Sequence, residues 1–70
     1  MKLKDLTNVL NEEYSITLKD YTGYDDVTAN SDYPDITYIE DDKQEKEVVL
    51  IDFWFNPRHN NEKAYYIEIK

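Results

Sequence analysis

The acidic side chains are the residues of this sequence whose type and spacing could do chemistry. Between residues 20 and 47, ten acids stand against two lysines, and this excess equals the net charge of −8 of the whole chain. A concentrated negative surface repels nucleic acid and membrane headgroups, and it attracts basic protein surfaces. The sequence therefore favours a basic protein partner over nucleic acid or a membrane. The acids are Asp20, Asp25, Asp26, Asp32, Asp35, Glu40, Asp41, Asp42, Glu45 and Glu47.

Carboxylates spaced along an extended chain can imitate a row of phosphates. Residues advance roughly 3.3 Å each in a strand, so neighbours on one face lie about 6.6 Å apart. Glu40 and Asp42 would form one such pair, and Glu45 and Glu47 another. A partner that holds DNA in a groove of lysines and arginines would bind these acids in its place. The competing interpretation is that the acids only keep a small domain soluble.

Tyrosines are interleaved with the acids, at Tyr21, Tyr24, Tyr33 and Tyr38. Tyrosine is enriched at protein interfaces because it buries much area at low entropic cost and keeps a hydroxyl for hydrogen bonding. Tyr21 and Tyr38 could equally belong to strands or to the core, whereas Tyr24 and Tyr33 are harder to bury. We therefore predict a partner-binding surface made of Asp20, Tyr24, Asp25, Asp26, Asp32, Tyr33, Asp35, Glu40, Asp41, Asp42, Glu45 and Glu47.

Catalytic and metal-binding patterns are weak in this chain. His59 is the only histidine, cysteine is absent, and neither a phosphate-binding glycine loop nor a nucleophile elbow is present. Asp25, Asp26, Asp32 and Asp35 could bind calcium through their oxygens, but the spacing of a calcium-binding loop is missing. We expect a protein that is not an enzyme and that has no cofactor and no metal.

Length and composition predict one small domain, residues 1–70. A chain of 70 residues has a small core, and without cysteine only apolar burial can hold that core together. An aromatic content of 14% argues for a folded chain rather than a disordered acidic segment. No stretch resembles a signal peptide or approaches the roughly 20 apolar residues of a membrane span. We expect a cytoplasmic location.

The apolar pattern predicts an α+β fold, with one N-terminal helix packed on a four-stranded antiparallel sheet. Leu3, Leu6 and Leu10 follow the helical period and predict a helix at about 3–12. Segment 22–35 is rich in turn residues and is expected to be a long acidic loop. Alternating segments predict strands at about 14–21, 36–41, 47–55 and 63–69.

The strongest strand signal lies at 47–55, and both of its faces are apolar. We therefore expect a central strand with both faces covered for part of its length. Trp54 is interpreted as a core residue in preference to a partner contact. One face carries Val49, Ile51, Phe53 and Phe55, and the other carries Val48, Leu50 and Trp54.

The opening of the chain combines a short predicted helix carrying Asp5-Leu6, a predicted strand from Tyr14 to Leu18, and a polar turn containing Thr and Gly. In these features it resembles type II anti-CRISPR proteins, the bacteriophage inhibitors of Cas9. The resemblance covers the first third of the chain, and the strands that follow depart from it, so no functional residue is carried over. It implies a phage or mobile-element inhibitor in the cytoplasm of a host bacterium. Its acids would occupy the site where Cas9 reads the short duplex motif beside its target.

Other interpretations stay open. The chain is similar to the uracil-DNA glycosylase inhibitors, which pair a helix with an antiparallel sheet and present acids where DNA would lie, and Glu13-Tyr14-Ser15-Ile16 loosely matches their acidic motif. An acidic antitoxin or immunity protein would have one cognate toxin as its partner. A small phage structural protein would use the acids only for solubility. The oligomeric state is not indicated by the sequence.

Overall fold

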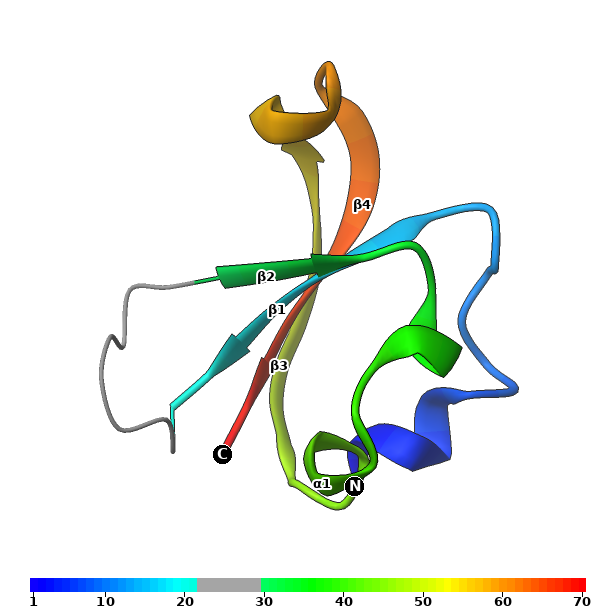
Figure 1. Ribbon diagram of the computed structural model, residues 1–70, viewed down its shortest axis with the longest axis vertical. Coiled ribbons are helices and arrows are strands. Elements are labelled where there is room, and N and C mark those ends of the chain that lie inside the picture. The colour runs from blue at the N-terminus through cyan, green and yellow to red at the C-terminus, as the bar shows by residue number, and fades with distance from the viewer. Residues whose placement is uncertain (22–29) are drawn as a thin grey trace.

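The computed structural model describes residues 1–21 and 30–70, which form one mixed sheet of four strands in the order β2-β1-β4-β3 (Figure 1). Strand β1 is antiparallel to β2 and parallel to β4, and β4 is antiparallel to β3. The expected fully antiparallel sheet is therefore wrong at its centre, where β1 and β4 run in the same direction. The strands are β1 (Ser15–Asp20), β2 (Asn30–Tyr33), β3 (Val48–Asn56) and β4 (Glu62–Ile69).

The predicted helix at 3–12 is also wrong. Only a four-residue 3₁₀ turn forms, η1 (Leu3–Leu6), and both of its leucines are buried. Leu10 packs against the same core without being helical. The intervening residues include threonine and asparagine, which are weak helix formers, and an isolated helix of about ten residues is marginal. The leucine spacing marks the residues that face the core, but local propensity does not sustain a helix.

The strand predicted at 36–41 is replaced by two short helical turns, η2 (Ile36–Tyr38) and α1 (Asp41–Gln44). The Asp35 carboxylate accepts a hydrogen bond from the Thr37 N–H at 2.8 Å and so caps η2. Ile36 and Ile39, three residues apart, are both buried. The apolar spacing here is that of a helical turn.

The second strand of the sheet lies instead in the segment expected to be a loop. Strand β2 takes up residues 30–33, and residues 22–29 of that predicted loop lie outside the described residues. All four β2 residues carry polar groups, which masks the strand in the sequence. Cross-strand pairing supplies the stabilisation, because Asp32 lies opposite Thr17 and accepts a hydrogen bond from its hydroxyl at 2.8 Å.

The hydrophobic core covers one face of the sheet. Residues of β1 and β4 supply that face, and η1, η2 and the segment after η2 cover it. Within the described residues, no helix is long and apolar enough to cross a membrane. The buried core consists of Leu3, Leu6, Ile16, Leu18, Ile36, Ile39, Tyr65, Ile67 and Ile69.

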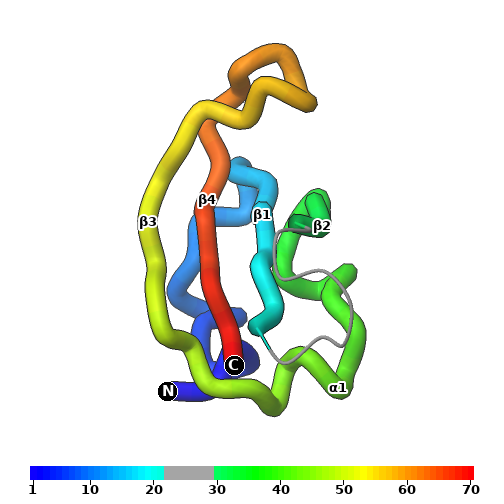
Figure 2. Tube along the Cα trace, turned by 90° about the vertical axis from the view of Figure 1, so that its left-hand side faces the viewer, coloured from blue at the N-terminus to red at the C-terminus, as the bar shows by residue number. Residues whose placement is uncertain are grey.

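Strand β3 is an edge strand, so the expectation of a central strand is wrong. Figure 2 shows it as the outermost strand, next to β4. The parallel pairing of β1 with β4 takes the centre of the sheet and leaves β3 with one neighbouring strand among the described residues. Its apolar side chains are consequently exposed, by 51% at Val49, 42% at Leu50, 43% at Ile51, 47% at Phe53 and 66% at Phe55. We refer to these five residues as the β3 edge.

Candidate protein-interaction surfaces

Asp20, predicted to bind a partner, is engaged inside the fold. It ends β1, and its side chain is only 11% exposed. One carboxylate oxygen lies 3.1 Å from the Lys43 Nζ and 2.6 Å from the Lys46 Nζ. Lys43 lies in α1, and Lys46 lies two residues after its end. Asp20 therefore ties that segment to the end of the sheet.

Replacing Asp20 by asparagine should lower the free energy of unfolding by about 1 kcal/mol, because two half-buried ammonium groups lose their carboxylate. Urea unfolding followed by circular dichroism measures the change. The matched control is Glu45→Gln, since Glu45 also pairs with two lysines, Lys2 and Lys4, but its side chain is 55% exposed. The control should not change stability measurably. Equal losses in the two variants would contradict the structural role of Asp20.

Asp32 is likewise engaged, in a polar network on the face of the sheet opposite the core. Its carboxylate accepts two hydrogen bonds from Arg58, at 2.8 Å from Nε and 2.9 Å from a terminal nitrogen. These bonds, together with those from Thr17 and Asn56, hold the pKa of Asp32 well below its usual range, although burial opposes the shift. The network thus joins β2 to the turn η3 (Pro57–His59).

The Thr17 hydroxyl is the centre of this network. It donates to Asp32, and it accepts from the Trp54 indole N–H at 3.1 Å and from the Asn56 amide at 3.3 Å. One donor and two acceptor sites are all that a hydroxyl offers, so its capacity is filled. Thr17 and Asn56 are both fully buried. The half-buried Trp54 therefore helps to hold β3 to β1 across the intervening strand.

Four further predicted residues serve local structure. Asp35 caps η2, as described above. The Tyr33 hydroxyl donates to a Glu40 oxygen at 2.8 Å, and burial followed by this bond raises the pKa of Tyr33 to about 12. The pKa of Glu40 is lowered, first by its own backbone N–H and then by Tyr33. Glu47 pairs with the N-terminal amine at 2.8 Å. Tyr24, Asp25 and Asp26 lie outside the described residues.

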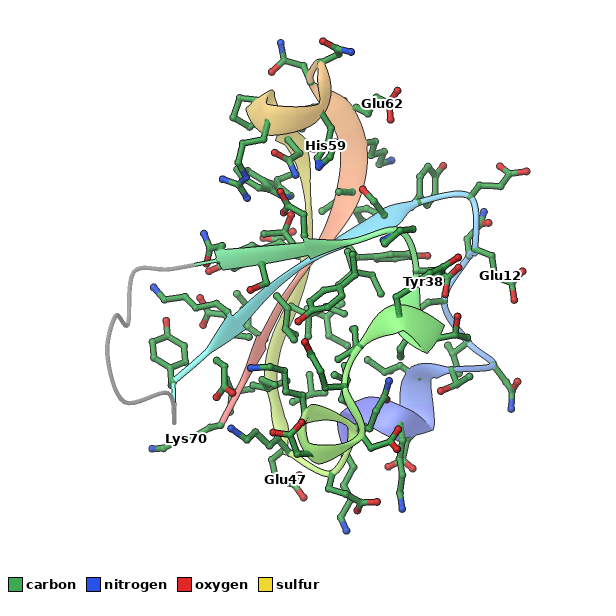
Figure 3. All side chains as sticks on the ribbon, in the orientation of Figure 1. Glu12, Tyr38, Glu47, His59, Glu62 and Lys70 are labelled. Atoms are coloured by element: carbon green, nitrogen blue, oxygen red, sulfur yellow. The ribbon has the colours of Figure 1, made fainter. Side chains whose placement is uncertain are left out.

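The remaining predicted acids, Asp41 and Asp42, are exposed on α1 and make no ion pair within residues 1–21 and 30–70. Tyr38, in the neighbouring turn η2, is 64% exposed and is labelled in Figure 3. Together with Glu40, these residues form a surface that we name the acidic–aromatic patch: Tyr38, Glu40, Asp41 and Asp42. The sequence alone does not distinguish an exposed Tyr38 from a core Tyr38.

The acidic–aromatic patch is held in a fixed position by residues within it and on either side of it in the chain. Ile36 and Ile39 insert into the core on either side of Tyr38. The Gln44 side-chain amide donates to the Ile36 carbonyl at 2.8 Å and, more weakly, to the Ile39 carbonyl at 3.4 Å. A surface that is already ordered loses less entropy on binding.

The hollows on the surface of the described residues include the following two. One, of about 390 Å³, is lined by Ser15, Asp32, Tyr33, Pro34, His59 and Glu62, and its most buried acid, Asp32, is already occupied by Arg58. His59 lies with its Nε2 3.4 Å from Asp32, and Figure 3 shows it at the end of the sheet opposite Glu47. The other, of about 290 Å³, adjoins the start of the β3 edge. Among the described residues, no group of three or more potential ligands is placed to hold a metal ion.

The fold and these surfaces define a small mixed-sheet protein that carries an acidic–aromatic patch and an apolar edge strand. No protein-family model, curated protein or solved structure matches the chain. The β3 edge was missed as a surface by the sequence analysis, because two apolar faces indicate a strand but not its neighbours.

Proposed function

We propose that the chain is a small protein-binding inhibitor that docks its acidic–aromatic patch on a basic protein surface. The observation that carries this proposal is Tyr38, a large aromatic side chain that is 64% exposed and lies two to four residues before the exposed acids Glu40, Asp41 and Asp42 in the chain. Tyrosine is among the residues that contribute most to binding at protein interfaces. Surrounding acids would steer a basic partner toward it and fix its orientation.

The positions of the nearby lysines support a role for the acidic–aromatic patch beyond solubility. Lys43 and Lys46 lie close in sequence to the patch, yet both are directed to Asp20. The charges of Asp41 and Asp42 are therefore left without a cation partner among the described residues. Solubility explains exposed acids, but it does not call for an exposed tyrosine next to them in the chain, whereas tyrosine is enriched at protein interfaces.

The proposed partner class is a DNA-binding enzyme, whose basic groove the patch would occupy in place of DNA. Because Asp41 and Asp42 lie on a helical turn, the strand spacing expected for Glu40 and Asp42 does not apply. The proposal rests on charge and on Tyr38, with no row of phosphate-like positions. Cas9 is the specific candidate, through the resemblance of the first third of the chain.

The test compares three forms of the chain as baits in a bacterial lysate: the native chain, Asp41→Lys/Asp42→Lys, and Glu12→Lys/Glu13→Lys. The control pair is also exposed and changes the net charge by the same amount. We expect the native chain and the control to capture one nucleic-acid enzyme, and the patch variant to capture at least about tenfold less. Duplex DNA and rising salt should both release the partner.

Two outcomes of this capture experiment would overturn the proposal or narrow it. Equal loss in both lysine variants would show attraction by net charge alone. Capture of a partner that duplex DNA does not release would favour the antitoxin or immunity class. Direct cleavage of a target duplex by Cas9 with its guide RNA tests the specific candidate: the native chain should inhibit cleavage, and Tyr38→Ala should weaken that inhibition.

A further inference from the structure

The backbone of β3 presents hydrogen-bonding groups along its outer side, and most of that side pairs with no other strand among the described residues. The Asn56 carbonyl accepts from the Asn61 N–H within the hairpin, so the peptide groups of Asn56 face β4. Direction alternates along a strand, and Ile51, Phe53 and Phe55 therefore direct their peptide groups outward. The hydrogen bond of the Phe53 N–H is consistent with an outward direction, because this group donates to the Asp52 carboxylate at 2.8 Å and not to β4.

The N-terminal segment covers only the beginning of this outer side. The Val48 N–H donates to the Met1 carbonyl at 2.8 Å, and the Leu3 N–H donates to the Lys46 carbonyl at 3.0 Å. Lys2 and Glu47 form an antiparallel bridge there. Beyond this bridge the outer side has no strand neighbour among the described residues. The chain thus already pairs with β3 at one end and leaves the larger part open.

We infer that the open part of β3 pairs antiparallel with β3 of a second copy of this chain, around a two-fold axis at Phe53. In this register Phe53 lies opposite Phe53 of the second copy, and Ile51 lies opposite Phe55. All three residues direct peptide groups outward, so both kinds of pair can exchange backbone hydrogen bonds once the Phe53 N–H leaves the Asp52 carboxylate. Their side chains also fall on one face, which joins two four-stranded sheets into one continuous sheet.

Charge favours this register over the one with its axis at the neighbouring Asp52. Asp52 is the only ionisable residue of β3. With the axis at Phe53, Asp52 lies opposite Trp54 of the second copy, and in each copy the Arg58 guanidinium lies 5.5 Å from the centre of the Trp54 ring. An axis at Asp52 would place two carboxylates directly opposite each other, which is destabilising. The acid of one copy therefore approaches Arg58 of the other, a cation that is also paired with Asp32 of its own copy.

A second copy fits this edge better than the basic partner proposed above. The chain carries a net charge of −8, yet only one of its acids lies on β3. A basic partner would find its complement on the acidic–aromatic patch, whereas the β3 edge offers apolar side chains. The two surfaces can therefore be occupied together.

The apolar area indicates a weak and reversible dimer. From their exposed fractions, the five side chains of the β3 edge present about 450 Å² per copy, or about 900 Å² for a symmetric pair. Specific interfaces start at about 1,000 Å². Two copies of the same negative charge also repel each other. Added salt should therefore strengthen the dimer, which is opposite to its effect on the patch.

Sedimentation equilibrium of the native chain, from about 1 μM to about 500 μM, tests the inference. We expect a monomer–dimer equilibrium that shifts toward the dimer in salt. Phe55→Lys should abolish the dimer, because the new ammonium group would lie opposite the apolar side chain of Ile51 in the second copy. Val9→Lys is the control, since Val9 is 73% exposed, lies outside β3 and gives the same change of charge. A native chain that is monomeric throughout, or a dimer that survives Phe55→Lys, would overturn the inference.

The register has its own test, because the chain contains no cysteine. Phe53→Cys places one thiol at the two-fold axis, where the opposing Cα atoms lie about 5.5 Å apart, within disulfide range. Mild oxidation should cross-link this variant into a covalent dimer. Neither Ile51→Cys nor Phe55→Cys should cross-link. In the proposed register position 51 of one copy lies opposite position 55 of the other, so each single cysteine faces an apolar side chain and not a second thiol. Efficient cross-linking of either one would contradict the proposed axis.

Discussion

Replacing Ile67 by alanine should unfold most of the protein at room temperature. Ile67 lies in β4, between β1 and β3, and is fully buried. Truncation of a buried isoleucine to alanine costs about 2–5 kcal/mol. A single core in a chain below about 70–80 residues rarely supplies more than about 3–5 kcal/mol. The loss is therefore comparable with the entire stability, and the far-ultraviolet circular dichroism of the variant should be that of an unfolded chain.

The matched control is Ile51→Ala, in the residue that lies opposite Ile67 across the β3–β4 pairing. Ile51 is 43% exposed, so its truncation leaves little cavity and should cost about 1 kcal/mol or less. Urea unfolding at a few micromolar, where the proposed dimer is dissociated, compares the two variants with the native chain. Similar losses at both positions would mean that β3 is covered on this face and that the edge assignment is wrong.

The contrast between Ile67 and Ile51 also shows what the sequence could predict. Alternation located β1, β3 and β4 to within about two residues at each end, because a half-buried strand leaves a local period. The order of strands leaves no such signal. Both faces of β3 are apolar, and that pattern is the same whether a strand has two neighbours or one. The parallel pairing of β1 with β4 joins residues about 50 positions apart, and no local pattern encodes it.

The short helical turns show a second limit of prediction from the sequence, which concerns the type of secondary structure. The spacing of Leu3 and Leu6 identified residues that do enter the core, and the error lay in extending them into a helix. Ile36 and Ile39 were assigned to a strand, although their spacing of three suits a helical turn. Strand β2 was missed because a polar edge strand has no apolar alternation. Its stabilising partner, Thr17, belongs to β1 and could not be recognised locally.

The acidic surface was predictable in its charge but not in its contacts. Asp20 and Asp32 were grouped with the exposed acids, yet their partners Lys43 and Arg58 lie 23 and 26 positions away in the sequence. Which acids stay available to a partner is decided by such tertiary pairs. Asp41 and Asp42 stay available because α1 directs its neighbouring lysine to Asp20. The fold thus reduces a broad acidic segment to a smaller patch around Tyr38.

Replacing Asp32 by asparagine should lower the free energy of unfolding at pH 7 by about 2 kcal/mol. Asparagine keeps the shape of the side chain and can accept from Thr17, but it cannot pair as an anion with Arg58. The Asp32 side chain is 17% exposed, and the hydrogen bonds to charged groups that it loses are worth about 1.5–3 kcal/mol. Asp41→Asn removes an equal charge from an exposed residue of α1 and should leave stability nearly unchanged.

The pH dependence separates this loss from a simple packing defect. Because the pKa of Asp32 is lower in the folded protein than its ordinary value of about 4, the unfolded chain takes up the proton first as pH falls. The stabilisation from Asp32 is therefore complete above about pH 5, and it is lost as pH falls through the folded pKa. Other acids titrate in both proteins and cancel in the comparison. Urea unfolding at pH 7 and at about pH 2.5 should show the gap between the native chain and Asp32→Asn shrinking on acidification, whereas a gap that stays constant would assign the loss to packing instead of to the charge of Asp32.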